Sequence, residues 1–264
     1  MRLWYQLLSS ETGMKNFIAA TQKLVDRVVS PGTTVEVRGT TQGVLGDQYR
    51  LFYNYDTREV IDNALKVRQG GGYDAFVLAN SLDPALVELR EMLDIPVVSF
   101  MEVNCFTACT MGERFGFIVA NRKISARYRE IIHGYGLRDR FAGCEALFFD
   151  DVRKQEDAFT DPAVADAVVE ETKRAARRAI DRGAEVLVLP GPPGALLAQM
   201  GIFEVEGVPV LDTYTLLAKV SETMAVMHKL TGVCVSRRTL YEAPPAELVR
   251  KVGAAYKVDL LRDG

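Results

Sequence analysis

Two loops in this 264-residue chain join an apolar run to a predicted helix, and the first, ANSLDP at residues 79–84, carries polar side chains. Such a loop directs free backbone N–H groups and the positive end of the helix dipole towards a ligand, which favours a carboxylate or a developing oxyanion. Asn80 and Ser81 add an amide and a hydroxyl, so both are candidate catalytic residues for oxyanion stabilisation. The alternative is that these side chains only satisfy the strand end and the helix start.

The second loop, LPGPPG at residues 189–194, combines three prolines that lack backbone donors with two glycines that permit close approach of the backbone. We expect Gly191, Pro192 and Gly194 to line a substrate site, where the Gly191 amide and the amides from Gly194 onward could bind an anion. The alternative is a rigid turn into a helix.

Hydroxyl and acidic residues follow other predicted strands. Ser9, Ser10 and Glu11 come at the end of the first strand and are candidate substrate-binding residues. Glu102 and Asp212 follow apolar runs at matching points of the two halves, and they are candidate catalytic carboxylates for general acid–base chemistry if burial raises their pKa. For each of these residues, the common alternative is capping of the helix that follows.

The four cysteines and two histidines do not suggest a metal site. Cys105, Cys109 and the cysteines at 144 and 234 form no CxxC pair, and His133 and His228 are the two histidines. We therefore expect neither a structural metal nor a disulfide framework. Cys105 and Cys109 share one face of a predicted helix without the electropositive surroundings that a nucleophilic thiol needs, so we expect both to be packing residues.

The elements that must position these residues alternate between strand-length apolar runs and segments of helical period, a pattern typical of βαβ units. In the first half the sequence predicts strands at 3–8, 34–38, 75–78 and 97–100, helices at 14–29 and 57–69, and a helix opened by Asp83 and Pro84. In the second half it predicts strands at 115–120 and 186–189, a helix opened by Asp161 and Pro162, and a helix at 214–230.

Like elements recur at a nearly constant spacing, which indicates an internal duplication. Residue 115 follows residue 3 by 112 positions, Gly191 follows Asn80 by 111, and Pro209 follows Pro96 by 113. The sequence therefore predicts an α/β fold of two pseudosymmetric domains with mainly parallel sheets. The first would comprise residues 1–100 plus 213–264, and the second residues 101–212. Because parallel sheets bind ligands outside the carboxyl ends of their strands, we expect a ligand cleft between the two domains.

Composition and charge exclude several kinds of partner. The formal net charge of -3, with acidic and basic residues interspersed, gives no basic face for nucleic acid. The start MRLWYQLLSSETG has a short apolar run, so we expect neither a signal peptide nor a membrane span and assign a cytoplasmic location. The expected partner is a small molecule, and a homo-oligomer that pairs through helices is expected as well.

Three phrases in the sequence resemble the aspartate/glutamate/hydantoin racemase superfamily, and hydantoin racemases in particular: DAFVLANSLDPALVELRE at 74–91, DIPVVSF at 94–100 with the following Glu102, and SRRTLYEAPP at 236–245. The resemblance covers nearly the whole chain. It implies a cofactor-independent enzyme with two pseudosymmetric α/β domains that acts on a small carboxylate or cyclic amide. One cysteine at a strand end of each half would exchange the α-proton on opposite faces of the substrate.

Both cysteine positions of that family are substituted in this chain. The first falls on Asn80, with Asp83 and Pro84 retained, and the second falls on Gly191. Neither an amide nor a hydrogen can accept a proton from carbon near neutral pH, so we do not expect two-cysteine racemisation. We expect lyase, hydrolase or isomerase chemistry instead, with oxyanion stabilisation by the two loops and a carboxylate or water as proton carrier. The alternatives are a binding or regulatory protein that kept the cleft, and an oligomeric scaffold.

Overall fold

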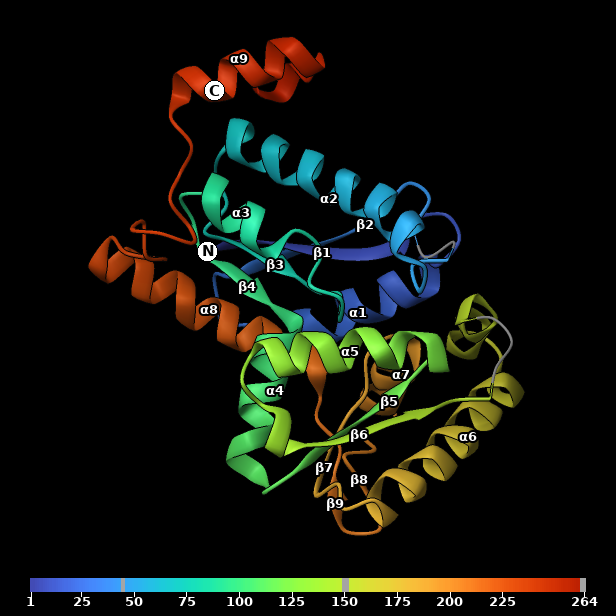
Figure 1. Ribbon diagram of the computed structural model, residues 1–264. Coiled ribbons are helices and arrows are strands. Elements are labelled where there is room, and N and C mark those ends of the chain that lie inside the picture. The colour runs from blue at the N-terminus through green and yellow to red at the C-terminus, as the bar shows by residue number, and fades with distance from the viewer. Residues whose placement is uncertain (44–45, 149–151, 262–264) are drawn as a thin grey trace.

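A computed structural model describes residues 1–43, 46–148 and 152–261, and its two parallel sheets confirm the predicted α/β class (Figure 1). The first sheet has the strand order β2-β1-β3-β4 and the second has the order β6-β5-β7. The strands are β1 (Arg2–Ser10), β2 (Thr34–Thr40), β3 (Ala75–Leu78), β4 (Val97–Ser99), β5 (Phe115–Val119), β6 (Phe141–Ala146) and β7 (Val186–Val188).

Helices connect the strands and cover the sheets. They are α1 (Lys15–Val28), α2 (Arg50–Gly70), α3 (Leu86–Met92), α4 (Phe100–Met111), α5 (Arg122–Gly134), α6 (Pro162–Asp181), α7 (Pro192–Gln199), α8 (Thr213–Thr231) and α9 (Ala246–Tyr256). Short 3₁₀ segments are η1 (Arg138–Arg140), η2 (Val152–Phe159) and η3 (Asp259–Leu261), and β8 (Glu204–Val205) pairs with β9 (Val208–Pro209). No helix in the described parts of the chain is long and apolar enough to span a membrane.

The two sheets share one topology, as the internal repeat predicts. In each sheet the first strand along the chain lies inside the sheet, with β1 between β2 and β3 and with β5 between β6 and β7. A parallel bridge between Leu187 and Val210 stands where β3 pairs with β4 in the first sheet. Strands β3 and β5 are buried along their whole length, which explains their continuous apolar sequences.

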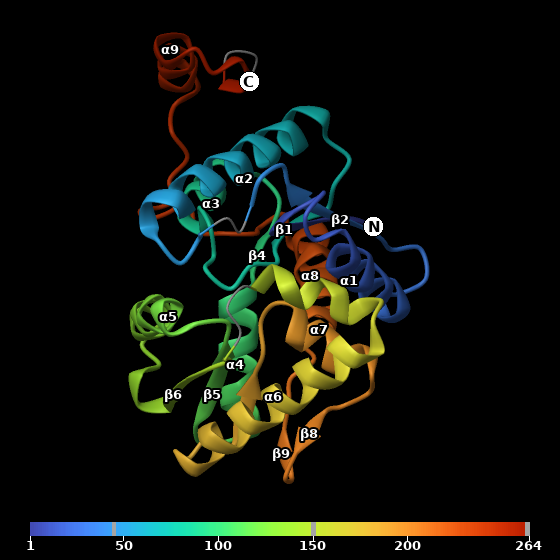
Figure 2. The same ribbon diagram turned by 90° about the vertical axis from the view of Figure 1, so that its right-hand side faces the viewer.

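Helix α8 joins the two halves through an aromatic cluster. Its residue Tyr214 packs against Phe17 of α1 and Phe100 of α4, with ring centroids 5.7 and 5.6 Å apart, and its carbonyl accepts a hydrogen bond of 2.9 Å from the Tyr5 hydroxyl. Figure 2 shows α8 and α1 together beside the first sheet, with the second half of the chain below them. The helix therefore returns from the second half to the first, as predicted.

The predicted cap of α3 is wrong. The helix begins at Leu86, the capping position is Ala85, and Asp83 has a φ of 45°. The Asp83 carboxylate turns into the interior, where it accepts hydrogen bonds from the Ser99 hydroxyl at 2.7 Å and the Tyr135 hydroxyl at 2.6 Å. These long-range partners override the local capping preference because they satisfy a buried charge. The predicted start of α2 is also wrong by seven residues, since the helix begins at Arg50.

Asp83 should make stability depend on pH. Burial raises its pKa from 3.8 to about 6, against the opposing effect of the Tyr135 and Ser99 hydrogen bonds. The folded state therefore binds the proton more tightly than the unfolded state, so acidification from pH 7 to pH 4 should favour folding through this group by about 2 kcal/mol. Urea unfolding at both pH values should show that Asp83→Asn lacks this gain relative to wild type. A difference between the two proteins that does not change with pH would contradict the assignment.

Candidate active site

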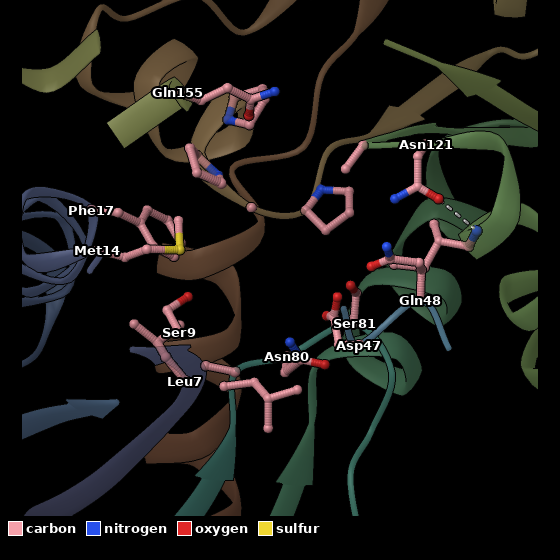
Figure 3. Close-up of a pocket in the computed structure, with 18 of the residues that line it drawn as sticks. Leu7, Ser9, Met14, Phe17, Asp47, Gln48, Asn80, Ser81, Asn121 and Gln155 are labelled. Atoms are coloured by element: carbon pink, nitrogen blue, oxygen red, sulfur yellow. Dashed lines mark hydrogen bonds between the residues drawn. The ribbon is translucent and has the colours of Figure 1, made fainter. Parts of the chain in front are cut away.

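A cavity of about 340 Å³ opens where the carboxyl ends of the central strands of the two sheets face each other. Its walls come from the ends of β1, β3, β5 and β7, from the loop before α2, and from α1, α5, α7, η2 and α8. Figure 3 shows Ser9, Asn80, Ser81 and Asp47 on one side of the cavity and Gln155 on the opposite side. The cavity therefore lies where the sequence predicts a ligand cleft.

Two asparagines present N–H groups to the cavity because their oxygens are already occupied. The Asn80 Oδ1 accepts a hydrogen bond of 2.9 Å from the Leu82 amide, and the Asn121 Oδ1 accepts one of 3.1 Å from the Ile124 amide at the start of α5. Each Nδ2 is thereby left as a donor that a ligand can use (Figure 3). Asn121 is missing from the predicted site, although it follows Ser9 by the repeat spacing of 112 residues.

Two serines line the same wall in different states. Ser9 is buried beside the cavity at the end of β1. The Ser81 hydroxyl is hydrogen-bonded to the Tyr128 hydroxyl of α5, so it connects the two halves of the chain. Burial raises the pKa of Tyr128 well above its ordinary value, and the phenol stays neutral at physiological pH. Ser81 and Tyr128 therefore form a neutral hydroxyl pair at the cavity wall.

Asp47 is the lining carboxylate among the described residues, and the sequence prediction does not include it. Burial raises its pKa from 3.8 to about 6, the charge of Asp56 raises it further, and the backbone amide of Gln48 and the charge of Arg127 act in the opposite direction. A carboxyl with this pKa exchanges protons readily near neutral pH. The signal that could have identified it is its place in the sequence, seven residues after the end of β2 at Thr40, which lies at the carboxyl edge of the first sheet.

The proline-rich loop contributes shape and few donors. Gly191 and Pro192 line the cavity, as do Pro190 and Pro193, whereas Gly194 is buried in α7 and is absent from the lining. The Gly191 amide donates a hydrogen bond of 2.8 Å to the Tyr214 hydroxyl. The Gly191 amide is therefore occupied, and the prolines beside it carry no amide hydrogen. The oxyanion contact that the sequence predicts from this loop has no free backbone donor at Gly191 or at these prolines.

The backbone of Gly191 excludes other residue types. Its φ of 77° and ψ of -166° lie in a region that is open essentially only to glycine. Gly191→Ala should therefore lower the free energy of unfolding by about 1 to 3 kcal/mol, although the nearest atom to the added methyl group, outside the two adjacent residues, is the Pro193 Cδ at 3.9 Å. Thermal and urea unfolding measure this loss. A variant as stable as wild type would show that the loop adopts another conformation.

The other predicted site residues lie outside the cavity lining. The Ser10 hydroxyl accepts from the Gly13 amide at 3.1 Å, and the exposed Glu11 carboxylate accepts from the Gly39 amide at 3.3 Å. The Glu102 carboxylate forms an ion pair of 2.6 Å with Arg90. Asp212 accepts a hydrogen bond of 3.3 Å from the Thr215 amide, which confirms the capping alternative for this residue.

No thiol or imidazole is among the described residues that line the cavity. Cys105 is buried in α4, and burial raises the pKa of its thiol well above the ordinary value. No group of three His, Cys, Asp or Glu side chains within the described ranges could hold a metal ion. The chemistry that this cavity can do is therefore proton exchange at Asp47 beside amide and hydroxyl donors.

Comparisons with known proteins agree with this architecture. The chain matches the Asp/Glu/hydantoin racemase family over residues 8–220. It is 24% identical to the hydantoin racemase of Paenarthrobacter aurescens over 230 residues, which are 86% of this chain and 92% of that protein. It is also 26% identical to the hydantoin racemase of Pseudomonas sp. (strain NS671) over 168 residues, and this match spans 64% of the chain and 65% of that relative, just under two thirds.

Solved structures show the same fold. Allantoin racemase from Klebsiella pneumoniae superposes with a TM-score of 0.78 at 23% identity, covering 93% of this chain and 94% of that one. A liganded mutant of arylmalonate decarboxylase superposes with a TM-score of 0.61 at 17% identity, covering 85% of this chain and 93% of that one. The family match extends over most of the sequence and includes both loops of the cavity. The chain therefore belongs to the Asp/Glu/hydantoin racemase family.

Proposed function

We propose that this protein is an enzyme that moves a proton at carbon in a small carboxylate or cyclic amide, with Asp47 as the proton carrier in place of a cysteine pair. The observation that carries this proposal is the cavity at the strand ends, whose described lining contains one carboxylate with a pKa of about 6 and no thiol. Asp47 replaces the carboxylates that the sequence suggests, because Glu102 is paired with Arg90 and Asp212 caps α8.

The reaction step balances with these groups alone. The Asp47 carboxylate takes a proton from the carbon next to a substrate carbonyl, and the electron pair of the C–H bond moves into that carbonyl to form an enolate. The Asn80 Nδ2 hydrogens stabilise the enolate oxygen, since the Asn80 Oδ1 is held by the Leu82 amide and cannot face it. Return of a proton from Asp47 then regenerates the substrate or its isomer.

The names of the relatives support the choice of substrate class. Hydantoin and allantoin are cyclic amides, and arylmalonates are small carboxylates, so family members with these names span both alternatives. All three kinds of molecule carry an acidic C–H beside a carbonyl group. A single carboxylate in the cavity favours lyase or isomerase chemistry, or exchange on one face of the substrate, over racemisation by two bases.

A survey in heavy water tests the proposal. Purified protein is incubated with hydantoins, amino acids, malonates and small unsaturated diacids, and the products are analysed by mass spectrometry and chiral chromatography. Deuterium at a substrate α-carbon, or loss of carbon dioxide with deuterium in its place, is the expected result. Binding of one of these compounds without exchange or product over long incubation would contradict the proposal and favour a binding or regulatory protein.

A further inference from the structure

We propose that Gln155 makes this cavity selective for a neutral ligand that presents an N–H donor beside a C=O acceptor, such as a cyclic amide, over a carboxylate. The inference rests on the proposed function for its site and adds a residue that determines specificity. Its starting point is an unpaired side chain. Gln155 lines the cavity and is 1% exposed, yet neither its Nε2 nor its Oε1 has a hydrogen-bond partner in the described structure.

Buried amide groups without partners are rare in folded proteins because they lose their hydrogen bonds to water. A ligand in the cavity would supply both missing partners at once. A primary amide pairs with an adjacent N–H and C=O through two parallel hydrogen bonds, donating to the carbonyl and accepting from the N–H. A carboxylate offers only acceptors, so it would leave the Gln155 Oε1 unsatisfied and facing negative charge.

Gln155 is held in place by contacts between the two halves of the chain. The neighbouring residue Glu156 is buried, and its carboxylate accepts hydrogen bonds from the Asn16 amide and, at 3.0 Å, from the Phe17 amide at the start of α1. The Phe159 ring packs on the Phe17 ring with centroids 6.1 Å apart. Segment η2 is therefore fixed on α1, and Gln155 faces the cavity from the side opposite Asn80 (Figure 3).

Several backbone amides that could bind an anion around this cavity are already occupied. The first amides of α1 donate to Glu156, the Ile124 amide of α5 donates to Asn121, and the Gly191 amide donates to Tyr214. The described lining contains no Lys, Arg or His, and the Asp47 carboxylate would repel a second negative charge. These observations favour a neutral ligand independently of Gln155.

Calorimetric binding tests this inference with three probes: hydantoin, 1,3-dimethylhydantoin, which has no N–H, and malonate, a carboxylate that offers only acceptors. Wild-type protein should bind hydantoin at least about 10-fold more tightly than either other probe. Gln155→Met keeps the side-chain size without hydrogen bonds, and it should remove most of that preference. Gln199→Met, an exposed substitution at the end of α7, is the matched control and should behave as wild type.

Gln155→Glu supplies a further check because it keeps the acceptor and loses the donor. It should weaken hydantoin binding and should not improve binding of malonate. A wild-type protein that does not prefer hydantoin, or a Gln155→Met variant that retains the preference, would overturn the inference. Because binding is measured without turnover, selective binding with no deuterium exchange would refute only the proposed function, and exchange that is independent of Gln155 would refute only this inference.

Discussion

Asp47→Asn should lower the rate of solvent deuterium incorporation into the substrate by about 10² to 10⁴-fold, the usual contribution of a general base. An amide cannot accept a proton from carbon, and no other described lining residue is a carboxylate, thiol or imidazole that could replace it. The variant should still bind substrate, because the donors of Asn80 and Asn121 and the amide of Gln155 remain. Mass spectrometry of the recovered substrate measures the rate.

The pH dependence of exchange should identify Asp47 as the base. Its pKa is raised to about 6, so the active carboxylate form grows as the pH rises through 6, and kcat/KM should increase between pH 5 and pH 7 before reaching a plateau. Asp181→Asn, an exposed substitution in the last residue of α6, is the control and should leave both the rate and the profile unchanged. Exchange by Asp47→Asn at the wild-type rate would exclude Asp47 as the proton carrier.

The fold could be predicted because its signals are local. Apolar runs of four to six residues mark β3 and β5, and Asp161 with Pro162 marks the start of α6, where the Asp161 side chain accepts hydrogen bonds from the amides of Ala163 and Val164 as predicted. The repeat spacing reflects the shared topology of the two sheets. It therefore allowed the position of the cavity, between the strand ends, to be predicted. These features depend on neighbours in sequence or on a duplicated pattern.

The composition of the site could be predicted only in part. Asn80, Ser81 and Ser9 line the cavity because each directly follows or ends a central strand. Asp47 lies in an irregular segment before α2 and Gln155 lies in the 3₁₀ segment η2, so their approach to the cavity depends on how α2 and η2 pack. Glu102 has the right position in the repeat, but Arg90 from α3 binds its carboxylate, and nothing in the spacing of these residues predicts that ion pair.

Asn80→Ala should lower kcat for exchange by about 10² to 10³-fold, which is the usual cost of removing one oxyanion donor. The donor acts mainly on the enolate, where the oxygen carries a full negative charge, so KM should change much less than kcat. Loss of the Leu82 hydrogen bond should cost about 1 kcal/mol of stability, and the variant should remain folded. Steady-state kinetics and circular dichroism measure the two effects.

Two comparisons separate this role from a structural one. Asn54→Ala, an exposed substitution in α2, should retain wild-type kinetics. Asn80→Asp keeps an oxygen that can accept from the Leu82 amide but replaces the donor with negative charge, so it should retain stability and lose at least as much activity as Asn80→Ala. If Asn80 served only to hold the loop, Asn80→Asp would be nearly fully active. Full activity in Asn80→Ala would instead assign stabilisation of the enolate to other donors of the cavity. Among these, the Asn121 Nδ2 is an amide donor of the same type.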